Sequence, residues 1–143
     1  MGMLIEKPGI HEHMTALENL RYFSLLFGIQ SQDHHRILEM VGLQNAEKKK
    51  ARQFSLGMKQ RLGIAISLLG NPDFLILDEP INSLDPEGVY EMRKMLETLN
   101  RENGTTIMIA SHILSELYKL ATDYAIIILA VLRCVVWISY FIC

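Results

Sequence analysis

The sequence predicts an α/β protein in which a block of helices precedes alternating strands and helices. Two observations predict this class. Before residue 70, apolar residues recur at helical spacing. From residue 74 onward, short apolar runs alternate with helical segments in the order strand, helix, strand, helix, strand. That order is typical of a parallel sheet, and a length of 143 residues corresponds to about one domain.

The helical block is expected over about residues 15–70. Thr15 and Glu18 form a capping box, because the threonine oxygen can accept a free backbone amide while the glutamate reaches back. The first helix therefore begins there and stops near Gly28. The other elements expected in this block are a helix over residues 31–41, a loop or short exposed turn over residues 45–52, and a helix over residues 56–69 that Ser55 caps.

The α/β core is expected over about residues 71–124. Residues 74–77 form a short apolar run bounded by turn residues, which fits a strand buried on both faces. Asp85, Pro86 and Glu87 mark a helix start, with an N-cap, a proline in the first turn and an acid near the helix dipole. The further expected elements are the end of that helix near Asn103, a strand over residues 105–110, a helix over residues 113–121 and a candidate strand over residues 124–128.

The last part of the chain, residues 125–143, is strongly hydrophobic and has Arg133 as its single charged residue. Its length makes it a candidate transmembrane segment. An arginine in mid-span costs about 2.5–3.5 kcal/mol, which weakens that interpretation. The alternative is a buried final strand followed by sequence that belongs to no fold, such as an out-of-frame segment, and the residues leave both open.

Composition gives no sign of a nucleic-acid partner. The formal net charge is −2 and the isoelectric point is near 6.2, whereas nucleic-acid-binding domains are usually basic. Both cysteines, Cys134 and Cys143, lie in the last ten residues and form no CxxC pair or metal spacing. A cytosolic, reducing location is the simplest interpretation.

Two adjacent carboxylates, Asp78 and Glu79, follow the first expected strand of the core. In open α/β sheets, ligands bind beside the carboxyl ends of the strands. Neighbouring strand residues point to opposite sides, so one carboxylate can hold Mg²⁺ while the other orients an attacking water. The alternative is an acid pair that caps a helix within a turn.

Two further places could contact a phosphate. Ser55 and Gly57 stand at a helix start, where free amides and the helix dipole favour an anion. An ordinary capped helix is the alternative there. His112 follows the second expected strand of the core and could donate a hydrogen bond to a γ-phosphate.

The ordered set of motifs resembles the nucleotide-binding domain of an ABC transporter. FSLGMKQR is similar to the signature motif LSGGQxQR, FLILDEP to the Walker B strand, NSLD to the D-loop, and Ser111-His112 to the switch-histidine loop. LIEKPG stands where the Q-loop should be, with Glu6 in place of its glutamine. The resemblance covers roughly residues 3–128, and several phrases are similar to bacitracin- and lantibiotic-resistance exporters. It implies a partial P-loop NTPase fold with a helical subdomain.

The resemblance also implies roles for individual residues and partners. Asp78 would serve Mg²⁺, Glu79 would polarise water and His112 would contact the γ-phosphate of ATP. The same resemblance assigns five more residues to the nucleotide, namely Ser55, Gly57, Gln60, Glu6 and Asp85. Asp85 would also belong to the subunit contact. The implied partners are a second nucleotide-binding domain, identical or different, and a membrane subunit at the cytoplasmic face of the cell membrane. The helices before residue 70 would touch that membrane subunit.

Departures from the family pattern limit this expectation. The sequence contains no G-x-x-x-x-G-K-[ST] phosphate loop, and Leu56 replaces the first glycine of the signature. We therefore expect an N-terminally truncated domain that binds ATP weakly, if at all, on its own. The alternatives are a non-functional gene fragment and a membrane-anchored interaction protein that uses the hydrophobic tail as its anchor.

Overall fold

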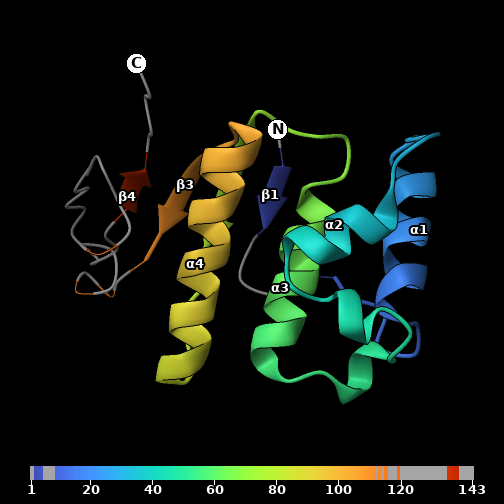
Figure 1. The fold of residues 1–143 in the computed structure, drawn as a ribbon, viewed down its shortest axis with the longest axis horizontal. Coiled ribbons are helices and arrows are strands. Elements are labelled where there is room, and N and C mark those ends of the chain that lie inside the picture. The colour runs from blue at the N-terminus through green and yellow to red at the C-terminus, as the bar shows by residue number, and fades with distance from the viewer. Residues whose placement is uncertain are drawn as a thin grey trace.

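The computed structural model describes residues 2–4, 9–111, 113, 115, 119 and 135–138. Figure 1 shows a helical part that stands beside a sheet. The helices are α1 (Ala16–Leu26), α2 (His34–Met40), α3 (Leu56–Ser67) and α4 (Pro86–Asn103), with short 3₁₀ turns η1 (Gln44–Ala46) and η2 (Ala51–Gln53). The strands are β1 (Gly2–Leu4), β2 (Phe74–Asp78), β3 (Thr106–Ala110) and β4 (Val135–Ile138).

The sheet has the strand order β1-β2-β3-β4. β1 pairs with β2 and β2 with β3 in parallel, whereas β4 pairs with β3 in the antiparallel direction. The parallel pairing of β2 and β3 confirms the predicted α/β class. The register aligns Asp78 with Ala110, so the ends of these two strands meet at one edge. β1 was not predicted, because three residues are too few to show a strand period.

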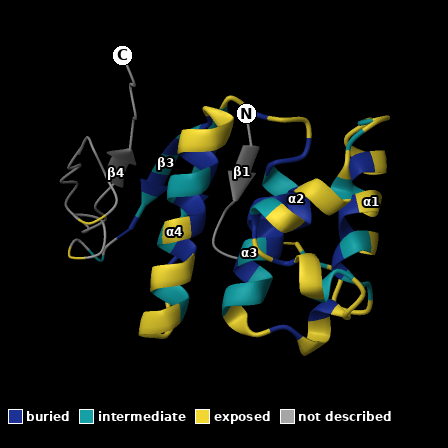
Figure 2. Ribbon diagram, in the orientation of Figure 1, coloured by how far each residue is buried: buried dark blue, intermediate teal, exposed yellow. Residues whose placement is uncertain are grey.

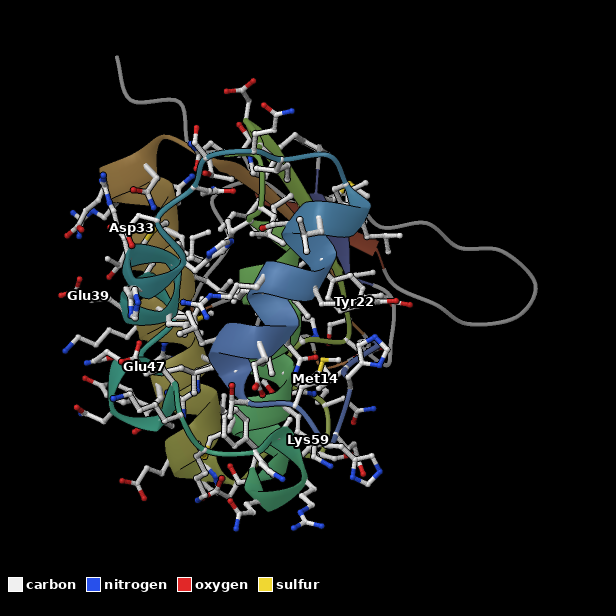
Figure 3. The ribbon with its side chains drawn as sticks, turned by 90° about the vertical axis from the view of Figure 1, so that its right-hand side faces the viewer. Met14, Tyr22, Asp33, Glu39, Glu47 and Lys59 are labelled. Carbon is white, nitrogen blue, oxygen red and sulfur yellow. The ribbon has the colours of Figure 1, made fainter. Side chains whose placement is uncertain are left out.

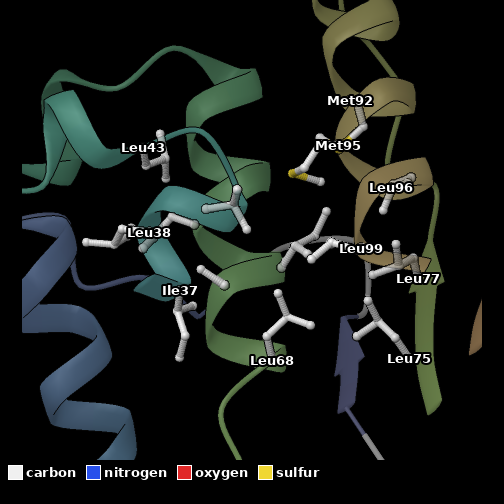
Figure 4. Packing of buried hydrophobic residues seen from close by; sticks show 14 of the residues in the cluster. Ile37, Leu38, Leu43, Leu68, Leu75, Leu77, Met92, Met95, Leu96 and Leu99 are labelled. Atoms are coloured by element: carbon white, nitrogen blue, oxygen red, sulfur yellow. The ribbon is translucent and has the colours of Figure 1, made fainter. Parts of the chain in front are cut away.

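The core lies between the helices and one face of the sheet. Leu75 and Leu77 of β2 are fully buried, and in Figure 4 they lie beside Leu96 and Leu99 of α4. Alternate residues of β2 are only half-buried. The expectation that this strand is buried on both faces is therefore wrong for the described part of the chain, because the helices pack on the face of Leu75 and Leu77.

The helical block confirms the predicted capping box. The Glu18 amide donates to Thr15 Oγ1 over 3.2 Å, and the Thr15 amide donates to Glu18 Oε2 over 2.7 Å. α2 begins later than expected, because Asp33 caps it by accepting the amides of His35 and Arg36. Figure 2 shows that the outer faces of these helices are exposed and their inner faces are buried.

α4 has the boundaries that its sequence predicts. Asp85 is its N-cap, Pro86 begins it, and Gly104 ends it in the left-handed region at φ 66°. A left-handed C-cap is the conformation that glycine adopts without a steric penalty. The Asp85 side chain, however, makes no capping hydrogen bond. The residue type predicted the start of the helix correctly but not the use of the carboxylate.

Most of the predicted C-terminal elements lie outside the described residues. This applies to most of the helix expected over residues 113–121, to the strand expected over residues 124–128 and to most of the hydrophobic tail. Within the tail, the structure describes β4 alone. Among the described residues, no helix is both long and apolar enough to span a membrane.

Candidate functional site

The carboxyl end of β2 carries the predicted acid pair. Asp78 is the last residue of the strand, and Glu79 begins the following turn with φ 50°. The Glu79 amide donates to the Ala110 carbonyl over 2.8 Å, which extends the pairing of β2 and β3 by one bond. Both carboxylates are half-buried. Because Asp78 ends β2 and Glu79 follows it, both lie at the sheet edge where α/β proteins bind ligands.

Ser111 orients the second of these carboxylates. Its hydroxyl donates to Glu79 Oε2 over 3.2 Å and accepts the amide of Ile113 over 3.2 Å. Ser111 is 1% exposed, so the hydroxyl is a fixed partner. Sequence reasoning gave Ser111 no role of its own. The position of Ser111 directly after a strand parallel to β2 could have indicated this role, because the carboxyl ends of adjacent parallel strands lie side by side.

A compact turn leads from the acid pair towards α4. The Asn82 amide donates to the Glu79 carbonyl over 3.1 Å, and the Leu84 amide donates to the Ile81 carbonyl over 3.4 Å. Ser83 has φ 62°, a conformation that residues other than glycine adopt infrequently. The turn delivers residues 83–85 to the start of α3.

The start of α3 has the features of an anion-binding helix terminus. Ser55 is the N-cap, and its hydroxyl oxygen accepts the Met58 amide over 3.3 Å. Because the oxygen acts there as an acceptor, the hydroxyl proton stays available to an incoming acceptor. Ser55 is exposed and Gly57 is half-buried, so backbone amides of the first turn are within reach of a ligand. Leu56, which replaces the first signature glycine, is 49% exposed.

A cleft of about 290 Å³ brings three predicted residues together, Ser55, Gly57 and Asp85. Arg61 and Glu91 also line it and form an ion pair of 2.8 Å. Asp85, Glu87 and Glu91 give the α4 side of the cleft a negative charge. A polyphosphate in this cleft would therefore need cations from elsewhere, such as a lysine of another subunit or Mg²⁺.

Gln60 does not line this cleft. Its side chain is buried, and Nε2 donates to the Asn82 carbonyl over 3.4 Å. In the part of the chain that the structure describes, Oε1 has no hydrogen-bond partner. Gln60 thus makes a contact that ties α3 to the turn after β2, and its nucleotide contact stays a prediction.

The predicted residues thus fall into two groups. Asp78 and Glu79 lie at the end of β2, and Ser55, Gly57 and Asp85 lie in the cleft between α3 and α4. Glu6 and His112 lie outside the described residues.

Asp78 fits a magnesium ion of the kind that nucleotides bring. Among the described residues, no group of three or more His, Cys, Asp or Glu could hold a metal. Mg²⁺ in such sites is held by one or two carboxylates together with substrate phosphates and water, and does not need a protein cage. The single carboxylate of Asp78, at the carboxyl end of β2, is a hard oxygen ligand of the kind that Mg²⁺ prefers.

A family comparison decides the identity of this fold. The sequence model of the family described as ABC transporter matches residues 1–82, which is more than half of the 143 residues. The chain belongs to the ABC transporter family. Its α/β sheet with an inserted helical block is the corresponding part of an ABC ATPase, as the sequence predicts.

Two curated relatives give the likeness in detail. The chain is 48% identical over 121 residues to the lantibiotic transport ATP-binding protein SrtF of Streptococcus pyogenes, which covers 85% of this chain and 52% of the relative. It is 48% identical over 128 residues to the bacitracin transport ATP-binding protein BcrA of Bacillus licheniformis, which covers 89% of this chain and 42% of the relative. The chain therefore spans about half the length of the curated relatives it matches.

Solved structures agree with this fold. A dimeric post-hydrolysis state of the ATP-binding cassette MJ0796, bound to ADP and Pi, superposes with a TM-score of 0.66 at 27% identity and covers 80% of this chain and 53% of that one. The ADP conformation of the cassette MJ1267 gives a TM-score of 0.70 at 24% identity, covering 83% and 54%. The second likeness concerns the fold alone.

Proposed function

We propose that the chain acts as the ATP-binding subunit of an exporter of the lantibiotic and bacitracin type, and that it contributes its signature helix to ATP held by a second subunit. The observation that carries this proposal is the cleft that joins Ser55, Gly57 and Asp85 and does not include Asp78 or Glu79. A site divided in this way suits two subunits that each supply one part. The relatives' names supply the class of transport.

At the β2 edge, the chain's own residues would prepare water for attack on a phosphate. Mg²⁺ held by Asp78 would neutralise charge on the phosphates. Glu79 would accept a hydrogen bond from the attacking water, and Ser111 Oγ would hold the carboxylate in place through its 3.2 Å bond. Ser111 is thus a positioning residue for Glu79.

At the cleft, the start of α3 would bind the γ-phosphate of the partner's ATP. The free amides of the first turn and the positive end of the helix dipole favour an anion there. The Ser55 hydroxyl would donate to a phosphate oxygen while its oxygen keeps the Met58 amide. Asp85, on the opposite side of the cleft, would meet the second subunit.

The membrane subunit would contact α1. Tyr22, Leu25, Leu26 and Phe27 are 41%, 81%, 63% and 56% exposed, and we name these side chains the apolar patch of α1. Figure 3 shows Tyr22 projecting from the outer side of this helix. Such a patch fits an apolar cytoplasmic segment of a membrane protein. The double substitution of Leu25 and Leu26 by aspartate should abolish co-purification with the membrane subunit and leave unchanged the chain's ability to restore ATPase activity in the complementation experiment below.

A complementation experiment tests the central proposal. The Streptococcus pyogenes relative is prepared with its signature serine replaced, so that its own ATPase activity is low, and the purified chain is added. A mixed dimer then holds one complete site, built from the relative's phosphate loop and the chain's signature helix. We expect ATPase activity to rise with the concentration of added chain.

Two variants sharpen this test. Ser55→Ala should reduce the rescue, because the hydroxyl faces the shared ATP. Glu79→Gln should leave the rescue intact, because the relative supplies the catalytic carboxylate at that site. Absence of rescue by the unaltered chain, or an equal loss with both variants, would refute the proposal.

A further inference from the structure

An ion pair joins the two walls of the cleft. Arg61 belongs to α3, the wall that Ser55 begins, and Glu91 belongs to α4, the wall that Asp85 begins. Arg61 Nη2 donates to Glu91 Oε2 over 2.8 Å. Both residues lie in the second turn of their helices, whereas Ser55 and Asp85 are the N-caps. The pair therefore joins the helices further along than the groups that the proposed function assigns to the ligand and to the second subunit.

The guanidinium of Arg61 is held on two sides. Its Nη1 lies 3.3 Å from the place that a Cβ on Gly42 would take, and Gly42 stands just after the C-cap of α2. Its Nη2 bonds the carboxylate of Glu91 on α4. The Arg61 side chain is 19% exposed and that of Glu91 is 47% exposed. Because the guanidinium is planar and rigid, these contacts give the ion pair a defined geometry.

A different contact holds the same two helices nearer their starts. The side chain of Leu84 lies 3.4 Å from the place of a Cβ on Gly57 in α3, and the Cβ of Leu84 lies 3.5 Å from the place of a Cβ on Gly88 in α4. A single contact between two helices fixes their distance but lets them pivot about it. A second contact further along also fixes the angle between them. The ion pair of Arg61 and Glu91 is such a second contact.

We propose that Arg61 and Glu91 are positioning residues: their ion pair sets the angle between α3 and α4 and so holds Ser55 where the partner's ATP meets it. This inference rests on the proposed function of the cleft. Neither side chain has to touch the nucleotide for this role. The loss of either residue should therefore have the same effect on the activity of the mixed dimer.

The charge of the cleft gives this proposal a distinctive sign. Asp85, Glu87 and Glu91 make the α4 wall negative, so Glu91→Gln removes a charge that repels a phosphate. An electrostatic effect alone would then strengthen phosphate binding and raise activity. The loss of a positioning contact would lower activity. A fall in activity with Glu91→Gln is thus the opposite of the electrostatic expectation.

The test applies Arg61→Met, Glu91→Gln and their double substitution to the complementation experiment with the signature-deficient relative. We expect rescue to fall about fivefold or more for each single variant, because a misplacement of about 1 Å can cost about 100-fold in rate. The double variant should fall no further than either single variant, since both substitutions remove the same contact. The matched control is Glu102→Gln, an exposed glutamate near the other end of α4, which should rescue as the unaltered chain does.

Urea unfolding of the same chains shows whether the ion pair forms in solution. At low salt, the two substitutions should be coupled by about threefold in the equilibrium constant of unfolding, which is within the range of partly exposed pairs. The coupling should shrink at about 1 M salt, where charges are screened over about 3 Å. Glu91 is exposed, so Glu91→Gln reports on the pair without removing a packed side chain.

The outcomes separate this inference from the proposed function. Coupling in unfolding together with equal losses of rescue supports the inference. Full rescue by Glu91→Gln overturns it, and so does a loss confined to Arg61→Met, which would mean that the guanidinium contacts the nucleotide itself. Absence of coupling in unfolding overturns it even where rescue falls. If the unaltered chain gives no rescue, the proposed function fails and this inference fails with it, whereas the other outcomes leave the proposed function standing.

Discussion

Replacing Asn19 by alanine should destabilise the chain through one identifiable backbone group. Asn19 is fully buried in α1. Its Oδ1 accepts the His11 amide over 2.8 Å, and its Nδ2 donates to the carbonyls of His11 and Thr15 over 3.1 and 2.9 Å. These bonds fasten the segment before α1 onto the helix.

The size of the expected loss of stability depends on which backbone groups keep a hydrogen-bond partner after the substitution. After Asn19→Ala, the Thr15 carbonyl still accepts the backbone amide of residue 19, and the His11 carbonyl still accepts the Met14 amide. The His11 amide loses its acceptor. An unsatisfied, partly buried amide costs about 1–3 kcal/mol, and the lost net bonds bring the expected loss to about 2–3 kcal/mol. Urea unfolding followed by circular dichroism measures this loss.

Two companion variants make the reasoning falsifiable. Asn19→Asp keeps the acceptor for the His11 amide but turns an oxygen towards the carbonyls of His11 and Thr15, so at pH 7 it should destabilise at least as much as alanine. Asn45→Ala removes an exposed asparagine of η1 and should change stability by less than about 0.5 kcal/mol. A loss below about 1 kcal/mol for Asn19→Ala would show that water replaces the lost bonds and would refute the account.

Three other predictions concern acid stability, the core and nucleotide binding. Burial lowers the pKa of His34, whose Nε2 lies 2.7 Å from Ser24 Oγ, below the ordinary value of 6.5. The unfolded chain therefore binds the proton first, so stability should fall as pH drops through 6.5 towards the lower folded pKa, and His34→Gln should flatten that fall in urea titrations. Leu96→Ala should cost about 2–5 kcal/mol in the same assay because Leu96 is buried against the sheet, whereas Leu25→Ala on the exposed face of α1 should cost little. Calorimetry should detect no micromolar ATP binding by the purified 143-residue chain, since its sequence holds no phosphate loop.

Local chemistry explains why much of the fold was predictable. The capping box at Thr15 determines one helix start through hydrogen bonds between residues three apart, and Pro86 favours another through its fixed φ, so the residue types suffice. The apolar run that forms β2 was recognisable for the same reason. Whether both faces of β2 are covered depends on where α4 packs, and a local pattern does not contain that information.

The candidate site was predictable as a set of residues but not as a geometry. Adjacent acids after a strand predicted Asp78 and Glu79 at the sheet edge. The bond from Ser111 to Glu79 joins residues that are 32 positions apart, and the contact from Gln60 to Asn82 joins residues that are 22 positions apart. Such contacts follow from the register of β2 and β3 and from the packing of α3, so a motif in one segment could not reveal them.

The turn between the two groups of site residues is held at three points. At its start, the Glu79 amide bonds the Ala110 carbonyl on β3. In its middle, the Asn82 carbonyl accepts Gln60 of α3. At its end, Leu84 packs between Gly57 and Gly88. Because both ends are fixed to regular structure, we expect the carboxylates at the β2 edge and Asp85 in the cleft to keep a constant separation, so that a displacement of α3 must move both or break one of these contacts.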